Sequence, residues 1–140
     1  MNFLLDTCVI SELVKNSPRR QVVEWVDSQD EATLFLSAIT IGELEKGIAK
    51  LPASVRKTKL ATWVRRELAG RFSGRLMPID VRVASRWGTI SGESERRGAP
   101  LPVIDALLAA TALVYDLQVV TRNVGDFKRA GVECLNPWEA

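Results

Sequence analysis

The sequence contains no histidine and only two cysteines among its 140 residues. Without histidine, the chain lacks the commonest general base and cannot build the Ser-His or Cys-His pairs of nucleophilic enzymes. Cys8 and Cys134 are far apart and belong to no CxxC pair, so we interpret both as small buried apolar side chains and expect no zinc site. Any catalysis must therefore use carboxylates, lysine, hydroxyl groups or a hard metal ion.

Long apolar runs are also missing. Every such run falls far short of the ~20 residues that a membrane-spanning helix needs, and no signal peptide opens the chain. The apolar fraction of 46% and the charged fraction of 26% are ordinary for a globular protein. We therefore expect one domain over residues 1–140, located in the cytoplasm and without contact with a membrane.

The net charge of +2 is unevenly distributed along the chain. Residues 46–97 carry 13 Lys/Arg and 4 Asp/Glu, a net charge of +9, whereas residues 1–45 and 98–140 have net charges of −5 and −2. A basic middle between acidic ends could bind a polyanion beside an acidic centre. The alternative is that amphipathic helices use these lysines and arginines only for solubility.

Short apolar segments of strand character alternate with segments of helical periodicity. We expect strands near residues 3–5, 33–36, 76–79, 117–121 and 132–135, and helices near residues 9–14, 22–26, 40–51, 60–72, 83–90 and 103–114. Such alternation is typical of βαβ units. The sequence therefore predicts an α/β fold with three layers (α/β/α) around a central, mostly parallel sheet.

Four acidic residues are predicted at one edge of this sheet. Asp6 follows the first strand, Glu43 opens the helix after the second, Asp126 follows Thr121, and Asp105 begins the apolar helix. Ligands of open parallel sheets collect at the carboxyl ends of the strands. Because clustered carboxylates repel each other unless a cation lies among them, we predict a Mg²⁺ or Mn²⁺ site with these four acids as catalytic metal ligands.

Each acid also has a purely structural interpretation. Asp6 could cap the following helix, and Asp105 could interact with the dipole of its own helix. Thr40-x-x-Glu43 matches a capping box, in which the glutamate bonds back to the cap residue. Asp126 could simply lie in a turn after a strand.

Other polar residues accompany the acids. Hydroxyl or amide groups that could orient a ligand or water belong to Thr7, Thr121 and Asn123, although ordinary capping is an equal alternative. Cations that could contact the phosphate backbone of a polyanion, or simply be solvated, are Arg122, Arg86, Lys46 and Lys50.

Several blocks of the sequence together resemble the PIN-domain family. In chain order they are Leu4-Leu5-Asp6-Thr7, the segment 37–44 (SAITIGEL), the segment 105–112 (DALLAATA), the segment 120–127 (VTRNVGDF), and the ending Leu135-Asn136-Pro137-Trp138, which looks like the VapC and FitB branch. The resemblance covers essentially the whole chain.

The resemblance implies a Mg²⁺- or Mn²⁺-dependent endoribonuclease that acts as the toxin of a toxin–antitoxin pair. Such proteins are usually dimeric and are inhibited by a small antitoxin. Asp6, Glu43 and Asp105 match the three core acids of the family. Asn123 stands where many relatives have aspartate, with Asp126 three residues later, and Cys8 replaces the usual Asn or Ser.

Two other functions remain possible from the sequence. A receiver-like domain or another Mg²⁺-dependent phosphoryl-transfer enzyme would also collect acids at the edge of a parallel sheet, but it would need a lysine near a strand end. A non-catalytic binding module could use the acidic pocket to bind a basic tail. The apolar helix 103–114 and the four tryptophans favour a homodimer, although both could belong to the core.

Overall fold

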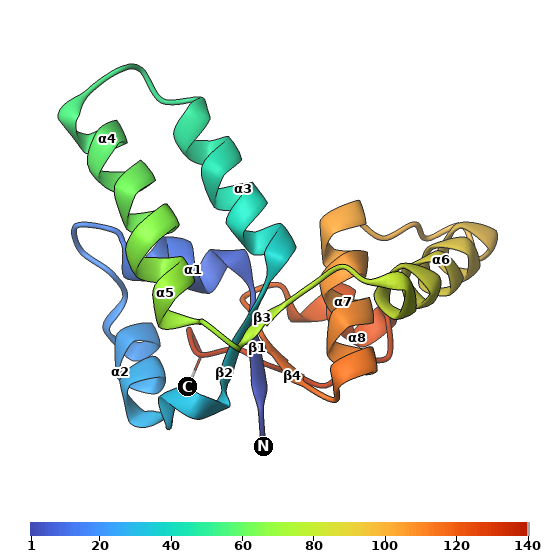
Figure 1. Cartoon of the computed structure of the whole chain (residues 1–140). Coiled ribbons are helices and arrows are strands. Elements are labelled where there is room, and N and C mark those ends of the chain that lie inside the picture. Colours follow the sequence, from blue (N-terminus) through green and yellow to red (C-terminus); the bar gives the residue numbers. More distant parts are fainter. Residues whose placement is uncertain (140) are drawn as a thin grey trace.

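Five short strands form one parallel sheet in the computed structural model, which describes residues 1–139 (Figure 1). The strand order is β3-β2-β1-β4-β5, and every neighbouring pair is parallel. The strands are β1 (Phe3–Leu5), β2 (Leu34–Ser37), β3 (Leu76–Met77), β4 (Gln118–Val120) and β5 (Cys134–Leu135). The predicted strands are confirmed, with ends that differ by at most two residues, and the short β3 ends before Pro78 at the edge of the sheet.

Helices cover both faces of the sheet and connect the strands. They are α1 (Thr7–Leu13), α2 (Arg20–Ser28), α3 (Ala38–Ala49), α4 (Val55–Thr62), α5 (Ala69–Arg71), α6 (Val81–Arg96), α7 (Val103–Tyr115) and α8 (Val124–Arg129). A 3-10 turn, η1 (Glu31–Thr33), precedes β2, and a π-helical segment, η2 (Trp63–Leu68), joins α4 to α5. The predicted three-layer α/β/α arrangement is therefore confirmed.

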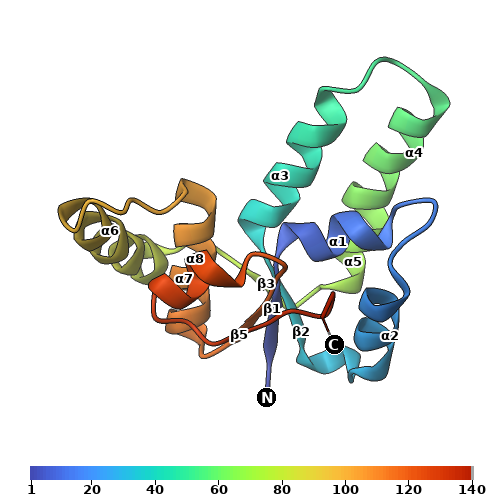
Figure 2. The same ribbon diagram turned by 180° about the vertical axis from the view of Figure 1, so that it is seen from behind.

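The alternation of side chains along the strands divides the core into two halves. Phe3 and Leu5 face a cluster formed with α1, α2 and the end of η2, whereas Leu4 faces a cluster formed with α7 and α8. Figure 2 shows these two groups of helices on opposite sides of the sheet. Because both faces are covered, the strands are almost uniformly apolar, as is usual for parallel sheets.

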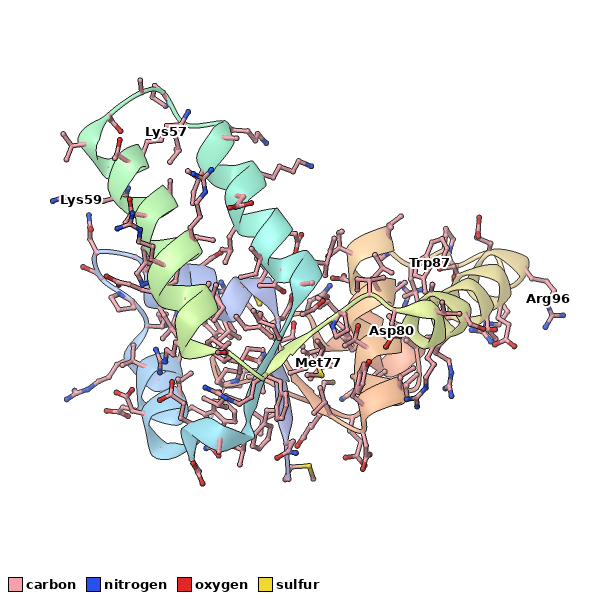
Figure 3. The ribbon with its side chains drawn as sticks, in the orientation of Figure 1. Lys57, Lys59, Met77, Asp80, Trp87 and Arg96 are labelled. Atoms are coloured by element: carbon pink, nitrogen blue, oxygen red, sulfur yellow. The ribbon has the colours of Figure 1, made fainter. Side chains whose placement is uncertain are left out.

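Polar cap residues at the end of a strand or shortly after it set the starts of three helices. The carboxylate of Asp6 accepts a hydrogen bond from the Thr7 amide at the start of α1, and Ser37 caps α3. Asp80, labelled in Figure 3, caps α6. Each cap satisfies amide groups that the first helical turn leaves free.

The order of the strands places a switch point between β1 and β4. From β1 the chain runs through β2 to β3 on one side, and then crosses to β4 and β5 on the other side. Ligands of open α/β sheets bind at the carboxyl ends of the strands on either side of such a point. Asp6 follows β1 and Thr121 follows β4, so both lie at this position.

Candidate active site

Asp6 is the most buried of the four acids, with 7% of its surface exposed. The Thr7 amide and the Thr121 hydroxyl each donate a hydrogen bond of 2.7 Å to its carboxylate, and the Cys8 thiol lies 3.5 Å from Oδ2. The predicted helix cap is therefore real, but it uses only one of the two oxygens. The other oxygen is held by Thr121, which is itself fully buried.

Glu43 meets the same region from α3. The Thr7 hydroxyl donates to Glu43 Oε1 and lies 3.1 Å from the hydroxyl of the buried Thr40. Thr7 thus connects Asp6 and Glu43, two acids that are 37 positions apart in the sequence. The capping-box interpretation of Glu43 is wrong, because Ser37 caps α3 and Thr40 lies inside the first turn.

Asp105 and Asp126 are connected by Asn123. The side-chain amide of Asn123 donates to Asp105 Oδ2 (3.0 Å) and to Asp126 Oδ2 (2.7 Å), and its backbone amide donates to the Thr121 hydroxyl (2.9 Å). Through Thr121 this network continues to Asp6. All four predicted acids and all three predicted supporting residues therefore belong to one network at the carboxyl edge of the sheet.

The environment of Asp105 opposes its negative charge. Burial, followed by the negative charges of Asp6 and Asp126, raises the pKa of Asp105 to about 6. Leu108, Ala109 and Ala112 share the face of α7 that carries Asp105, and all three are buried. A carboxyl group in such surroundings favours a cation that would compensate its charge.

Asp126 lies in a different electrostatic environment. Arg129 forms a 2.7 Å ion pair with its Oδ1, and Arg129 and Asn123 hold the pKa of Asp126 below its ordinary value. The alternative interpretation, that Asp126 simply lies in a turn after a strand, is wrong, because Asp126 occupies the first turn of α8. Arg129 was missed in the sequence; its only signal is the i,i+3 spacing from Asp126.

The two cysteines are free and only half-buried, so the prediction of buried side chains is partly correct. Burial and the charge of Asp6 raise the pKa of the Cys8 thiol to about 11, which keeps it protonated. Cys8 therefore adds a neutral polarizable neighbour to Asp6 rather than a further charge.

The predicted cations are distributed over three places. Arg122 follows β4 beside the acids, is exposed, and lies over the Trp138 ring at 5.5 Å. Lys46 and Lys50 line a hollow that also contains Glu43. Arg86 lies on α6, in a different hollow that includes none of the four acids. The structure therefore does not bring Arg86 together with the site.

The donor set fits a hard divalent cation. The acids supply carboxylate oxygens, which magnesium and manganese prefer, and the neighbouring hydroxyl and amide groups can orient water. Within residues 1–139, no three His, Cys, Asp or Glu side chains already form a preassembled metal cage. The hydroxyl and amide groups of the network lie between the acids instead. The groups that donate hydrogen bonds to Asp6 come from Thr7, Cys8 and Thr121, and none of the three is the lysine that a receiver-like domain would need.

The fold and this edge of the sheet identify the class of protein. The PIN domain family matches residues 3–133, and the chain belongs to that family. It is 38% identical to VapC ribonuclease Y4jK of Sinorhizobium fredii, over 97% of both chains. It is also 38% identical to toxin FitB of Neisseria gonorrhoeae, over 96% of this chain and 97% of that protein.

The solved structures agree with this assignment. The crystal structure of FitAcB from Neisseria gonorrhoeae contains a chain that superposes with a TM-score of 0.92 at 37% sequence identity, over 99% of both chains. The resemblance to the VapC and FitB branch is therefore confirmed across the whole domain.

Proposed function

We propose that this protein is a divalent-metal-dependent endoribonuclease that hydrolyses RNA phosphodiester bonds and acts as the toxin of a toxin–antitoxin pair. The observation that carries the proposal is the network in which Thr7 connects Asp6 to Glu43 and Thr121 connects Asp6 towards Asp105. The names of its relatives, a VapC ribonuclease and the toxin FitB, support the same activity.

Asp6, Glu43 and Asp105 are the residues that would hold Mg²⁺ or Mn²⁺, and Asp126 is a fourth candidate on the Asn123 side. When bound, the cation supplies Lewis-acid activation of water and compensates negative charge at the phosphate. PIN-domain ribonucleases generally use a divalent metal. Activation of water by a cation would not require a histidine as general base, and the chain contains none.

The residues around the acids hold them in defined orientations. Thr121 and the Thr7 amide fix both oxygens of Asp6, so this carboxylate keeps one orientation within the folded protein. Asn123 presents its amide to Asp105 and Asp126 at once, and Arg129 neutralises part of the charge of Asp126. The two outer acids can therefore stay close together without full mutual repulsion.

Asp126 already has a positively charged partner, Arg129, in the folded protein. The ion pair with Arg129 reduces the capacity of Asp126 to bind a further cation, because the guanidinium already compensates part of its charge. We infer that Asp6, Glu43 and Asp105 form the principal site, and that Asp126 with Asn123 orients water or the leaving group beside it.

The proposed partners follow from the same assignment. We infer an RNA substrate with flexible single-stranded or looped regions, because such a backbone can bend into a recessed acidic site. We also infer a small cognate antitoxin, a homodimer, and a location in the cytoplasm. No helix within residues 1–139 is long and apolar enough to cross a membrane.

The test uses the purified protein and a 5′-labelled RNA mixture, incubated with MnCl₂, with MgCl₂ or with EDTA. Cleavage that requires a divalent metal, and that Asp105→Asn abolishes, is the expected result. Asp27→Asn is the matched control, because Asp27 is exposed on α2 and has the same chemistry. Equal cleavage by the Asp105→Asn variant and the wild type would contradict the proposal.

Three further assays address the two alternative functions and the homodimer. A stable aspartyl phosphate after treatment with acetyl phosphate would indicate a receiver-like domain. RNA binding without cleavage under every metal condition would indicate a binding module. A monomeric mass by light scattering at micromolar concentration would contradict the homodimer.

A further inference from the structure

A hollow of about 480 Å³ lies directly beside Glu43. One face of α3 lines it, and Ile104 at the start of α7 closes it from the other side. Figures 1 and 2 both show the first turns of α3 next to this end of α7. Its volume is in the range of pockets that bind small ligands.

Two glycines keep this hollow open. Gly42 and Gly47 both lie in α3, where glycine is less favourable than alanine. Neither has a positive φ, and a Cβ atom at either position would meet no atom within 4 Å. Close packing therefore does not explain these glycines, whereas their missing side chains leave Ile39 and Ile104 accessible as apolar walls.

The two ends of the hollow have opposite charge. Glu43 lies at the end that meets the acidic network, and Lys46 and Lys50 lie farther along the same face of α3. Lys50 is seven residues beyond Glu43, about 11 Å along a helix with 1.5 Å rise per residue. Both lysines are exposed, and neither forms an ion pair within the described part of the chain.

The apolar walls of the hollow and the lysines at its far end suit the base and the phosphate of one RNA nucleotide. We propose that the hollow binds the nucleotide next to the scissile phosphate, with its base against Ile39, Ile104 and the two glycines and its phosphate beside Lys46 and Lys50. Apolar side chains commonly hold an unstacked base in this way, and a base inside a duplex could not enter. The inference rests on the nuclease function proposed above and adds a substrate position to it.

The first experiment fills the hollow. Gly47→Leu is compared with Gly92→Leu, because Gly92 is also a helical glycine with free space around it, on α6 and outside the hollow. Fluorescence anisotropy in EDTA measures the Kd for a fluorescein-labelled single-stranded oligoribonucleotide of randomised sequence. We expect Gly47→Leu to raise this Kd at least tenfold and Gly92→Leu to leave it unchanged.

The same variants are then assayed with MnCl₂. Gly47→Leu is expected to raise KM and to change the base preferred next to the cut, as sequencing of the RNA ends measures, with a smaller effect on kcat. Thermal-shift titration with MnCl₂ alone should give the same metal affinity as the wild type. That result would separate a blocked nucleotide position from a disturbed acidic network.

The second experiment addresses the lysines. The slope of log Kd against log salt concentration should decrease by about 0.7 for each of Lys46→Gln and Lys50→Gln, as one lost phosphate contact to a single strand predicts. Lys59→Gln is the control, since Lys59 points away from α3 on the outer side of α4 (Figure 3). Equal slopes for Lys46→Gln and the wild type would overturn the phosphate assignment.

The outcomes distinguish this inference from the proposed function. Normal cleavage by the wild type, together with an unchanged Kd and unchanged base preference in Gly47→Leu, would overturn the nucleotide position alone. Binding that Gly47→Leu weakens, without cleavage by any variant, would overturn the nuclease function and leave the hollow as a nucleotide-binding site. If Gly47→Leu converted an RNA-free dimer into a monomer, the hollow would be an interface between two copies, and the inference would be overturned.

Discussion

Replacing Asp105 with asparagine is expected to stabilise the metal-free protein while it abolishes activity. The pKa of this carboxyl is raised from 3.8 to about 6, chiefly by burial and by Asp6. At pH 8 such a difference opposes folding by about 3 kcal/mol, since each pKa unit is worth about 1.4 kcal/mol. Because the side chain is partly exposed to solvent, screening reduces the expected effect to about 1 to 2 kcal/mol.

The direction of the pKa shift of Asp105 determines the pH range in which Asp105→Asn stabilises the protein. A carboxyl group whose pKa is raised on folding destabilises the folded state once the pH exceeds its ordinary value, and the penalty is complete above the raised value. The stabilisation by Asp105→Asn should therefore be small near pH 4, grow up to about pH 6, and stay constant above it. Asparagine keeps the same shape and can still accept the hydrogen bond from Asn123.

Urea unfolding in EDTA at pH 4, 6 and 8 measures this effect, with Asp27→Asn as the control for the loss of one charge. In millimolar MnCl₂ the order should reverse, because the wild type gains stability from the bound cation and the variant gains little. An Asp105→Asn variant that is less stable than the wild type in EDTA at pH 8 would refute the electrostatic argument.

Three further substitutions test how the fold supports the site. Glu12→Gln removes a carboxylate whose pKa is lowered chiefly by a hydrogen bond from Lys15; the wild type should lose stability more steeply than the variant as the pH falls below about 4.5, and parallel urea-midpoint profiles would contradict this. Thr121→Val removes the buried hydroxyl that donates to Asp6; we expect a loss of about 1 to 3 kcal/mol in urea unfolding together with slower cleavage, and an unchanged free energy of unfolding would argue against it. Leu108→Ala opens a cavity below the site and should lower the free energy of unfolding by about 3 to 5 kcal/mol. A loss below about 1 kcal/mol in urea unfolding would show that Leu108 does not support the buried side of α7 below Asp105.

The convergence of the acids could be predicted because it depends on a rule of topology. In a parallel sheet, each strand end carries the next residue to the same edge, so Asp6 and Thr121 meet whenever β1 and β4 are neighbours. Leu4, Val119 and the other strand residues identified those strands by their apolar character alone. The fold class and the position of the site therefore follow from local patterns.

The start of α3 could not be predicted from local signals. Ser37 and Thr40 are both good cap residues, and the sequence favours Thr40 because Glu43 follows three residues later. The choice is made by the sheet, since Ser37 is still paired with Met77 of β3 and the helix begins immediately afterwards. Glu43 is thereby free to contact Thr7.

The short helix α8 was missed for a related reason. It has only six residues and contains Gly125, so its intrinsic helical propensity is low. Phe127 is completely buried against α7 and β4, and the ion pair between Arg129 and Asp126 spans the helix. Tertiary packing rather than local sequence determines this helix, and it also fixes the partners of Asp126.

The position of β4 next to the central strand β1 has a consequence for protein synthesis. Thr121 and Asn123, which complete the surroundings of Asp6 and Asp105, are translated after more than four fifths of the chain. A nascent chain that ends before β4 lacks both the pairing of β1 with β4 and the hydrogen bond from Thr121 to Asp6. The growing chain therefore cannot assemble these surroundings of Asp6 and Asp105 until Thr121 and Asn123 have been synthesised.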